Sequence, residues 1–443
     1  MSQRESFGSR LGLLASMIGL AVGLGNVWRF PYMVGRFGGG AFVLLYLAIA
    51  ALVAVPALMG EWSIGRHTRR GTLGAFQRLG VPGGNGIGWL LMGTTWFAVA
   101  YYTNAIGWVF YHFLAELLTP LGRPLDPSRI LPPATGFSAT SMALQLGCTG
   151  LLLLAEASIV LRGIRGGIER ASKLLTPVLY GTLLVLIARS LTLPGAGEGV
   201  RWLLAFHASE ITPTVAIAAL GQVVFSVGLG GTLMLVYGSY LADGADIRAD
   251  ATWTVAGDTL AGLLAGLAIF PAVFALGMEP GSGPGLLFAT LPEIFARLPL
   301  GWVFGALFFG GLLGAALLSG VAAYEVLVAG FTDALGWSRR RATWLVCVVS
   351  LVLAVPPMIN LRIFVPWDLT FGSGGQTLGA LVAVVSVGWV MERGALLSQI
   401  AGERSSRADR ALVVWLRWVV PTAILAAAVW WLLTDALGVV QGV

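Results

Sequence analysis

The sequence predicts an all-α protein that crosses a membrane about eleven times. Of its 443 residues, 57% are hydrophobic and 11% are charged, and the mean hydropathy is +0.84. A soluble chain carries roughly a quarter charged residues, so most of this surface must face lipid. Apolar stretches of about 20 residues can cross the hydrocarbon layer as helices. They cover residues 11–35, 41–64, 87–118, 140–160, 172–193, 213–241, 252–277, 301–333, 343–360, 364–391 and 411–434.

Arginine placement predicts the orientation. Most of the 27 Lys and Arg residues fall on one side if the N-terminus is cytoplasmic, and cytoplasmic loops are enriched in these residues. We therefore expect a multi-pass protein of the inner (plasma) membrane with its N-terminus inside and, with an odd span count, its C-terminus outside. Basic loops of this kind anchor helices in the lipid bilayer, so no nucleic-acid binding is expected despite the pI near 9.7. No cleavable signal peptide is expected either.

The loops around residues 120–140 and 194–213 are too short to fold alone, so residues 1–443 are expected to form one transmembrane domain. A shorter segment, residues 285–298, is expected to be a re-entrant or surface helix. Cys148 and Cys347 both lie inside apolar runs, which argues against a disulfide framework.

Two of the predicted spans contain helix-weakening glycines in mid-membrane. Residues 19–31 read GLAVGLGNVWRFP and residues 225–231 read FSVGLGG. Glycine costs a helix about 1 kcal/mol relative to alanine, and proline removes a hydrogen bond. Freed backbone groups at this depth are costly unless they bind a ligand or line a cavity. Carbonyls suit sodium, and half-helix N-termini suit a carboxylate.

The two breaks lie five spans apart, a pattern that indicates a transporter site. The alternative is that these glycines only let helices pack closely. Two clusters in register, each beside a polar residue, favour the site.

Charged residues inside the spans are further candidates for functional roles. An arginine in an apolar span must pair or reach water, and Asp368 is the candidate partner for Arg29 at the outer mouth. Among the acids within or near spans, Asp258 lies well inside the seventh span with no basic residue nearby in sequence.

Residues 19–31 resemble the first-span signature of the neurotransmitter:sodium symporter family, which includes the bacterial leucine transporter. The likeness extends along the whole chain through the motifs Gly38–Phe42, Glu61–Arg66, Tyr101–Tyr102, Arg162–Ile164, Gly167–Arg170, Gly221–Gln222 and Gly266–Pro271. The resemblance implies a five-plus-five inverted repeat with broken helices 1 and 6. The first repeat would cover residues 11–193 and the second residues 213–391, with an extra helix at 411–434.

The resemblance also implies two sodium sites. The first would use the Ala21 carbonyl, Asn26, Ser226 and Asp258. The family often has Asn where this chain has Asp258, and the added negative charge would make chloride unnecessary. Gly262 falls where chloride-dependent relatives place a serine.

The second sodium site would use the carbonyls of Gly19, Val22 and Ala315 with the Ser319 hydroxyl. Leu318 departs from the family pattern, which offers a hydroxyl or carboxylate there. This site is therefore expected to be weakened, to recruit water or to be absent, and the ion ratio stays open.

For the substrate, the family implies that a carboxylate meets Tyr102, the first sodium ion and the amides near Leu24 and Gly25, while the amine meets carbonyls near Ala21 and Phe225. Monoamine transporters carry an aspartate where this chain has Gly23, so an amino acid is expected. The complete expected site is Ala21, Leu24, Gly25, Ala98, Tyr102, Phe225, Ser226, Gly228, Gly231, Ser319 and Ala323. Its small walls favour a bulky hydrophobic or aromatic side chain.

Two gates follow from the same resemblance. Arg29 and Asp368 would form the outer gate, beyond Tyr102 and Phe225. Arg4 and Asp333 would form the inner gate. The residues expected to support the inner gate are Tyr240, Glu325 and Glu169. Arg4 could instead serve only as a topology anchor.

The resulting hypothesis is sodium-coupled symport of a neutral amino acid by alternating access, for which a single chain would suffice. One alternative is a sodium-independent or proton-coupled transporter, and another is a transporter-like amino-acid sensor. An enzyme is not expected. The three histidines lie far apart without metal-ligand spacing, and no nucleophile motif or phosphate loop is present.

Overall fold

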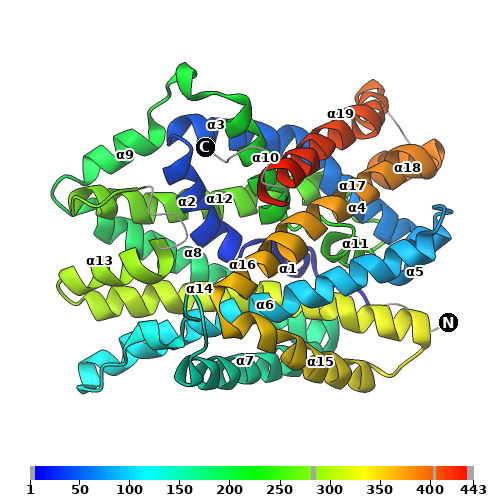
Figure 1. Ribbon diagram of the computed structural model, residues 1–443. Helices are drawn as coiled ribbons and strands as arrows, with labels where there is room; N and C mark the ends of the chain where they lie inside the picture. Colours follow the sequence, from blue (N-terminus) through cyan, green and yellow to red (C-terminus); the bar gives the residue numbers. More distant parts are fainter. Residues whose placement is uncertain (1–4, 281–285, 403–405, 437–443) are drawn as a thin grey trace.

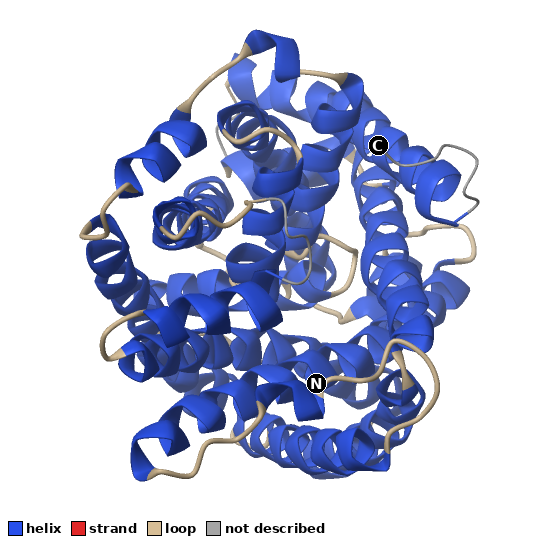
Figure 2. Ribbon diagram, turned by 60° about the vertical axis from the view of Figure 1, so that its left-hand side comes forward, coloured by secondary structure: helices blue, strands red, loops and turns tan. Residues whose placement is uncertain are grey.

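The computed structural model describes residues 5–280, 286–402 and 406–436, and within these ranges the chain is helical, without β-strands (Figures 1 and 2). The helices are α1 (Arg10–Ala21), α2 (Phe30–Arg36), α3 (Gly40–Ile49), α4 (Val55–Thr68), α5 (Thr72–Arg78), α6 (Gly84–Leu118), α7 (Ala139–Val160), α8 (Arg170–Leu191), α9 (Ala196–Leu204), α10 (Pro213–Val227), α11 (Leu233–Gly238), α12 (Ile247–Ala275), α13 (Leu291–Arg297), α14 (Gly301–Leu335), α15 (Arg339–Ile359), α16 (Leu361–Trp367), α17 (Gly375–Val385), α18 (Arg393–Ala401) and α19 (Arg407–Trp431).

Wide π-helical turns join several of these helices into longer spans, so that α3 and α4 form one helix over Gly40–Thr68 and α16 and α17 one over Leu361–Val390. In the described part of the chain, eight helices are long and apolar enough to cross a membrane, and the bent pair α1–α2 makes nine. The expected count of eleven is reached only by adding α6 and the interrupted pair α10–α11. Neither passes the same test of length and composition.

The first predicted break is present. α1 ends at Ala21, and Val22 has an extended backbone with ψ 114°. The chain resumes as a π-helical turn over Gly25–Arg29, which leads directly into α2. The helix axis bends by 53° between the two halves. The glycines that weaken the sequence here therefore mark a real change in direction.

The second predicted break is also present. α10 ends at Val227, and Gly228 follows with φ +73°, while Gly231 has φ +64°. L-residues with a Cβ rarely adopt these angles, whereas glycine does so at little cost. The chain stays non-helical until Leu233, where the short helix α11 begins.

α11 packs backbone to backbone on α4. A methyl group at Gly238 would lie 2.6 Å from the Trp62 Cα atom, and one at Gly65 would overlap the Leu235 carbonyl oxygen. Glycine at both positions is what allows the two helices to approach so closely. The segment after the second break is thus fixed to α4.

The long helices α6 and α14 pack against each other, and α8 and α12 both contact α1 (Figure 1). These helices surround the two breaks and bury them. Outside this core, the surface helix expected over residues 285–298 is present as a turn at Leu286–Thr290 followed by α13. Residue 285 lies outside the described ranges.

Candidate functional site

The predicted first sodium ligands come together where the two breaks meet α12. The Asn26 amide Nδ2 donates to Asp258 Oδ1 (2.7 Å) and to Ser226 Oγ (2.9 Å). Ser226 Oγ in turn contacts both carboxylate oxygens of Asp258, at 3.0 and 2.9 Å. The Tyr46 hydroxyl approaches Asp258 Oδ2 at 3.3 Å. Each of these side chains is buried, so the structure places four residues from four separate segments in one polar cluster.

The chemistry of this cluster suits a hard monovalent cation. It offers one carboxylate together with neutral amide and hydroxyl oxygens, which are ligands that such cations accept. In the described part of the chain, no group of three or more His, Cys, Asp or Glu side chains could hold a metal ion. The donor set at Asp258 is therefore one that a sodium ion would fit.

The predicted second sodium site is centred on Ser319. Its Oγ lies 2.9 Å from the Leu20 carbonyl oxygen, 3.3 Å from that of Val22 and 3.5 Å from that of Ala315. Leu318 presents a methyl group toward Gly19, because a side chain at that glycine would meet Leu318 Cδ1 at 2.9 Å. The oxygen that the family pattern supplies at position 318 is indeed missing.

A hydroxyl that the sequence reasoning did not single out lies on the same side of α1. Thr176 of α8 donates to the Ala15 carbonyl oxygen at 3.2 Å, and its Oγ1 would lie 2.6 Å from a methyl group at Gly19. Only the packing of α8 against α1 brings it there.

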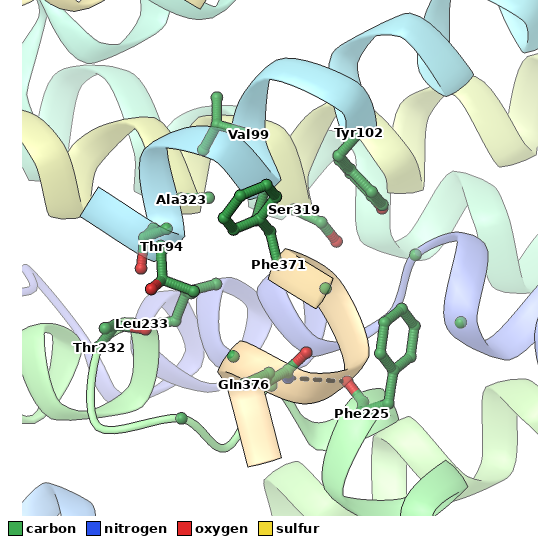
Figure 3. A pocket seen from close by; sticks show the side chains of 18 of the residues that line it. Thr94, Val99, Tyr102, Phe225, Thr232, Leu233, Ser319, Ala323, Phe371 and Gln376 are labelled. Carbon is green, nitrogen blue, oxygen red and sulfur yellow. Dashed lines mark hydrogen bonds between the residues drawn. The ribbon is translucent and has the colours of Figure 1, made fainter. Parts of the chain in front are cut away.

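A cavity of about 130 Å³ lies beside both clusters (Figure 3). The predicted residues that border it are Ala21, Gly25, Ala98, Tyr102, Phe225, Ser226, Gly228, Ser319 and Ala323. Its wall also contains residues that were not predicted. They include Thr94, Thr95, Val99, Thr232, Leu233, Phe371 and Gln376.

Two predicted residues do not border this cavity. Gly231 faces the other way, since a methyl group there would lie 2.9 Å from the Gly379 carbonyl oxygen and 3.2 Å from the Phe76 ring. Gly230 takes its place in the wall, which corrects the prediction by one residue. The Leu24 side chain lines a second cavity farther out, although its backbone amide points at the Tyr102 hydroxyl at 3.4 Å.

Gly23 is a point of close approach between helices in the site. A methyl group at this position would lie 2.6 Å from Ser319 Oγ and 2.7 Å from the Tyr102 hydroxyl. Any larger side chain would require the surrounding helices to move. The cavity consequently has no room for an acidic side chain at this position.

Glu61 of α4 holds the second break open. Its Oε1 accepts from the backbone amides of Gly230 (2.8 Å) and Gly231 (2.9 Å). The sequence identifies Glu61 only as the first residue of a motif that resembles the family. Its partner amides are free because the helix is interrupted, and unpaired they would cost roughly 1–3 kcal/mol each.

A larger cavity of about 710 Å³ lies outside Tyr102 and Phe225 and is bordered by both predicted outer-gate residues, Arg29 and Asp368. Among the described residues, Arg29 and Asp368 lie near enough to interact electrostatically, without a salt bridge between them. The Arg29 guanidinium instead lies over the Phe225 ring, 4.3 Å from its centre, and Asp368 hydrogen-bonds to Tyr101. The two residues share one wall, but the structure does not show their predicted pairing.

On the opposite side, Asp333 accepts from the Gly71 amide at 2.8 Å. Arg4, its predicted partner, lies outside the described residues. Tyr240 donates to Glu325 Oε1 at 2.8 Å, and Arg339 forms an ion pair with the same carboxylate.

Glu169 ties the start of α1 to α8. It accepts from the Gly8 amide at 2.7 Å and pairs with Lys173 at 2.6 Å. The side where the inner gate was predicted is therefore crosslinked by partly buried polar contacts, whereas the side of Arg29 and Asp368 opens into a cavity.

Comparison with known proteins agrees with this arrangement. The model of the sodium:neurotransmitter symporter family matches residues 4–123 and 138–435. An uncharacterized sodium-dependent transporter of Bacillus subtilis is 31% identical over 444 residues, covering 96% of this chain and 97% of the relative. One of Haemophilus influenzae is 32% identical over 450 residues, with the same coverage. The crystal structure of MhsT in complex with L-phenylalanine superposes with a TM-score of 0.84 at 33% identity, covering 96% of this chain and 99% of MhsT. The predicted all-helical membrane fold is confirmed.

Proposed function

The chain belongs to the sodium:neurotransmitter symporter family and is a sodium-dependent membrane transporter, not an enzyme, and on this basis we propose that it carries a neutral, bulky hydrophobic or aromatic amino acid together with sodium by alternating access. The observation that carries the proposal is the cluster of Asn26, Ser226 and Asp258 beside the cavity. Ser226 belongs to both, because it contacts Asp258 and borders the cavity.

An amino acid suits the cavity because its two charged groups find complementary backbone atoms. The carboxylate would lie between the Tyr102 hydroxyl, the amides of Leu24 and Gly25, and the bound sodium ion. The amine would lie against the carbonyls of Ala21 and Phe225, near the C-terminal ends of the half-helices. MhsT, a relative of similar length, binds L-phenylalanine in its crystal structure.

The crowding at Gly23 argues against an amine without a carboxylate. Such a substrate would need an acidic side chain as a counter-charge in the cavity, and a side chain at this position would collide with Ser319 and Tyr102. The counter-charge that a zwitterion needs is supplied by its own carboxylate.

Coupling would arise because sodium and substrate touch. The ion at Asp258 would contact the substrate carboxylate, so each would strengthen the binding of the other by the same factor. An inward sodium gradient and the membrane potential, about 2.3 kcal/mol per charge per 100 mV, would then drive uptake.

Chloride would not be required, since Asp258 supplies a negative charge beside the ion. The position that chloride-dependent relatives fill with serine is Gly262, where a side chain would meet the Phe30 ring at 3.2 Å. That close packing leaves little space for a chloride-binding hydroxyl.

The second sodium site would bind weakly. Ser319 and the carbonyl oxygens of α1 remain, but Leu318 contributes no oxygen, and a hard cation holds best with six or more. We propose that one sodium ion is bound firmly and that the second site depends on water.

We further propose that residues 11–193 and 213–391 form the two inverted halves, with the N-terminus cytoplasmic, the C-terminus outside and a single chain sufficient. Arg29 and Asp368 would close the outer side. The contacts of Asp333, Tyr240 and Glu325 would hold the inner side.

The test is uptake of radiolabelled amino acids into proteoliposomes with and without an inward sodium gradient. We expect uptake of large hydrophobic or aromatic amino acids that collapses when sodium is replaced by potassium. Full uptake without sodium would refute the coupling. Binding without counterflow would indicate a sensor instead.

A further inference from the structure

The end of the cavity farthest from Tyr102 and Phe225 has an unusual polarity. In Figure 3, Thr94 and Thr232 lie across the cavity from these two residues, which are the ones proposed to hold the substrate backbone. The amino acid's side chain would therefore point toward this far end. The inference that follows rests on the proposed function. It concerns which amino-acid side chain the transporter prefers.

Two threonines of α6 border the cavity, and the hydroxyl proton of each is donated to a backbone carbonyl of the same helix. Thr94 Oγ1 donates to the Leu90 carbonyl oxygen at 3.0 Å, and Thr95 Oγ1 donates to that of Leu91 at 2.9 Å. A hydroxyl has one proton and two lone pairs. Once the proton is directed at the backbone of the same helix, the oxygen can only accept a hydrogen bond from a ligand.

Gln376 of α17 also donates its hydrogen bonds to backbone carbonyls, which leaves its side-chain oxygen as an acceptor. Its Nε2 donates toward the carbonyl oxygens of Phe225 (3.3 Å) and Val224 (3.4 Å), which also accept from the backbone amides of Gly228 and Leu229 at the end of α10. Because both partners are acceptors, the amide nitrogen must face them. The carbonyl oxygen Oε1 is then turned toward the cavity (Figure 3).

At this end of the cavity, Thr94 and Gln376 thus present acceptors beside the Thr232 hydroxyl, and no charge. The residues that border the cavity include no Asp, Glu, Lys, Arg or His. An ammonium or guanidinium group on the ligand would be buried without a counter-charge, which is costly. A purely hydrocarbon ring would leave the acceptors without a partner once water is excluded. A neutral donor on a large, flat side chain satisfies both conditions.

Flatness follows from the glycines in the wall. The cavity wall includes Gly228, Gly230, Gly372 and Gly375, which have no side chain to project into it, and the Phe371 ring belongs to the same wall. Such surfaces favour a planar ring over a branched aliphatic chain.

We propose that the preferred substrate is an aromatic amino acid whose ring carries a neutral N–H or O–H group, as in tryptophan or tyrosine, and that Thr94 and Gln376 determine this preference by accepting its hydrogen bond.

The test compares ligands that differ only in the donor. Tryptophan, 1-methyltryptophan, which lacks the ring N–H, and 5-methyltryptophan, which keeps it at the same added volume, compete for sodium-dependent uptake. One neutral hydrogen bond is worth about 1 kcal/mol, so we expect 1-methyltryptophan to compete roughly five- to tenfold less well than the other two. Phenylalanine should compete less well than tyrosine.

Two variants test whether Thr94 and Gln376 cause the difference between the methylated ligands. In Thr94→Val and Gln376→Met the difference between the methylated ligands should shrink toward unity. Thr103→Val is the matched control, because Thr103 makes the same hydrogen bond within α6, to Val99 at 2.9 Å, but does not border the cavity. It should keep the full difference.

Equal competition by the two methylated ligands on the unmodified protein would overturn the inference, whether or not the variants fold. A preference that survives in both variants would overturn the assignment of residues. If no amino acid is taken up with sodium, the proposed function itself fails, and this result is distinct from the other two.

Discussion

Asp258→Asn is the sharpest test of the first sodium site. Alanine at this position would leave the Asn26 amide and the hydroxyls of Ser226 and Tyr46 without their shared acceptor, at roughly 1–3 kcal/mol each. Asparagine keeps the shape, since its oxygen can accept from Asn26 and its amide can donate to Ser226 and Tyr46. The substitution therefore removes the negative charge while keeping the packing and most of the hydrogen bonds.

The expected magnitude follows from the burial of the cluster. Asp258 has no exposed surface, and two unit charges about 4 Å apart attract by about 4 kcal/mol at an effective dielectric constant of about 20. The carboxamide oxygen retains part of this attraction, so about 4 kcal/mol is the upper value. Since 1.4 kcal/mol is tenfold in affinity, sodium affinity should fall by up to about a thousandfold.

The assay is a sodium titration of substrate-induced thermal stabilisation, because a ligand that binds only the native state raises its stability. The midpoint should move to much higher sodium while the melting temperature without ligand stays close to that of the parent protein. Asp126→Asn is the control. It is the same substitution in an exposed loop, where the Asp126 carboxylate accepts a hydrogen bond from the Ser128 amide. An unchanged sodium midpoint in Asp258→Asn would refute the ligand role.

Three other changes probe the rest of the site. Leu318→Thr should steepen the sodium dependence of uptake, because it restores an oxygen beside Gly19; an unchanged Hill coefficient would show that water already completes the second site. Glu61→Leu should lower the thermal midpoint well below that of Glu61→Gln, since only leucine leaves two buried amides without an acceptor; equal midpoints would contradict this role. Gly320→Ala places a methyl group against the buried Glu156 carboxyl and should destabilise by about 1–3 kcal/mol in thermal unfolding; combining it with Glu156→Ala should recover much of the loss, and no recovery would refute the steric explanation.

The interrupted helices were predictable from the sequence because their cause is local. Gly228 and Gly231 adopt positive φ angles, and no neighbouring helix is needed to see that glycine permits them. The grouping of Asn26, Ser226 and Asp258 is different, since Asn26 lies 200 and 232 positions from the other two and meets them only in the folded chain. It could be expected only from the resemblance to a family whose fold was known.

The parts of the site that were missed depend on packing between helices. Gln376 faces the break because α17 lies against the end of α10, and no pattern within α17 marks it. Gly231 was assigned to the cavity in place of Gly230, because the direction of each residue in a non-helical segment depends on backbone angles that the sequence does not give. Arg29 was paired with Asp368 by charge, whereas in the structure its guanidinium lies over the Phe225 ring.

The contacts of α4 with the second break have a consequence for motion. An interrupted helix offers a natural hinge, yet Glu61 binds both amides of this break, and Gly65 and Gly238 bring the backbones of α4 and α11 together. Bending at this break would separate buried polar groups from their partners, so α11 and α4 must travel as one rigid unit. A change of angle at this break would therefore break the hydrogen bonds of Glu61, which favours motion at other points of the chain.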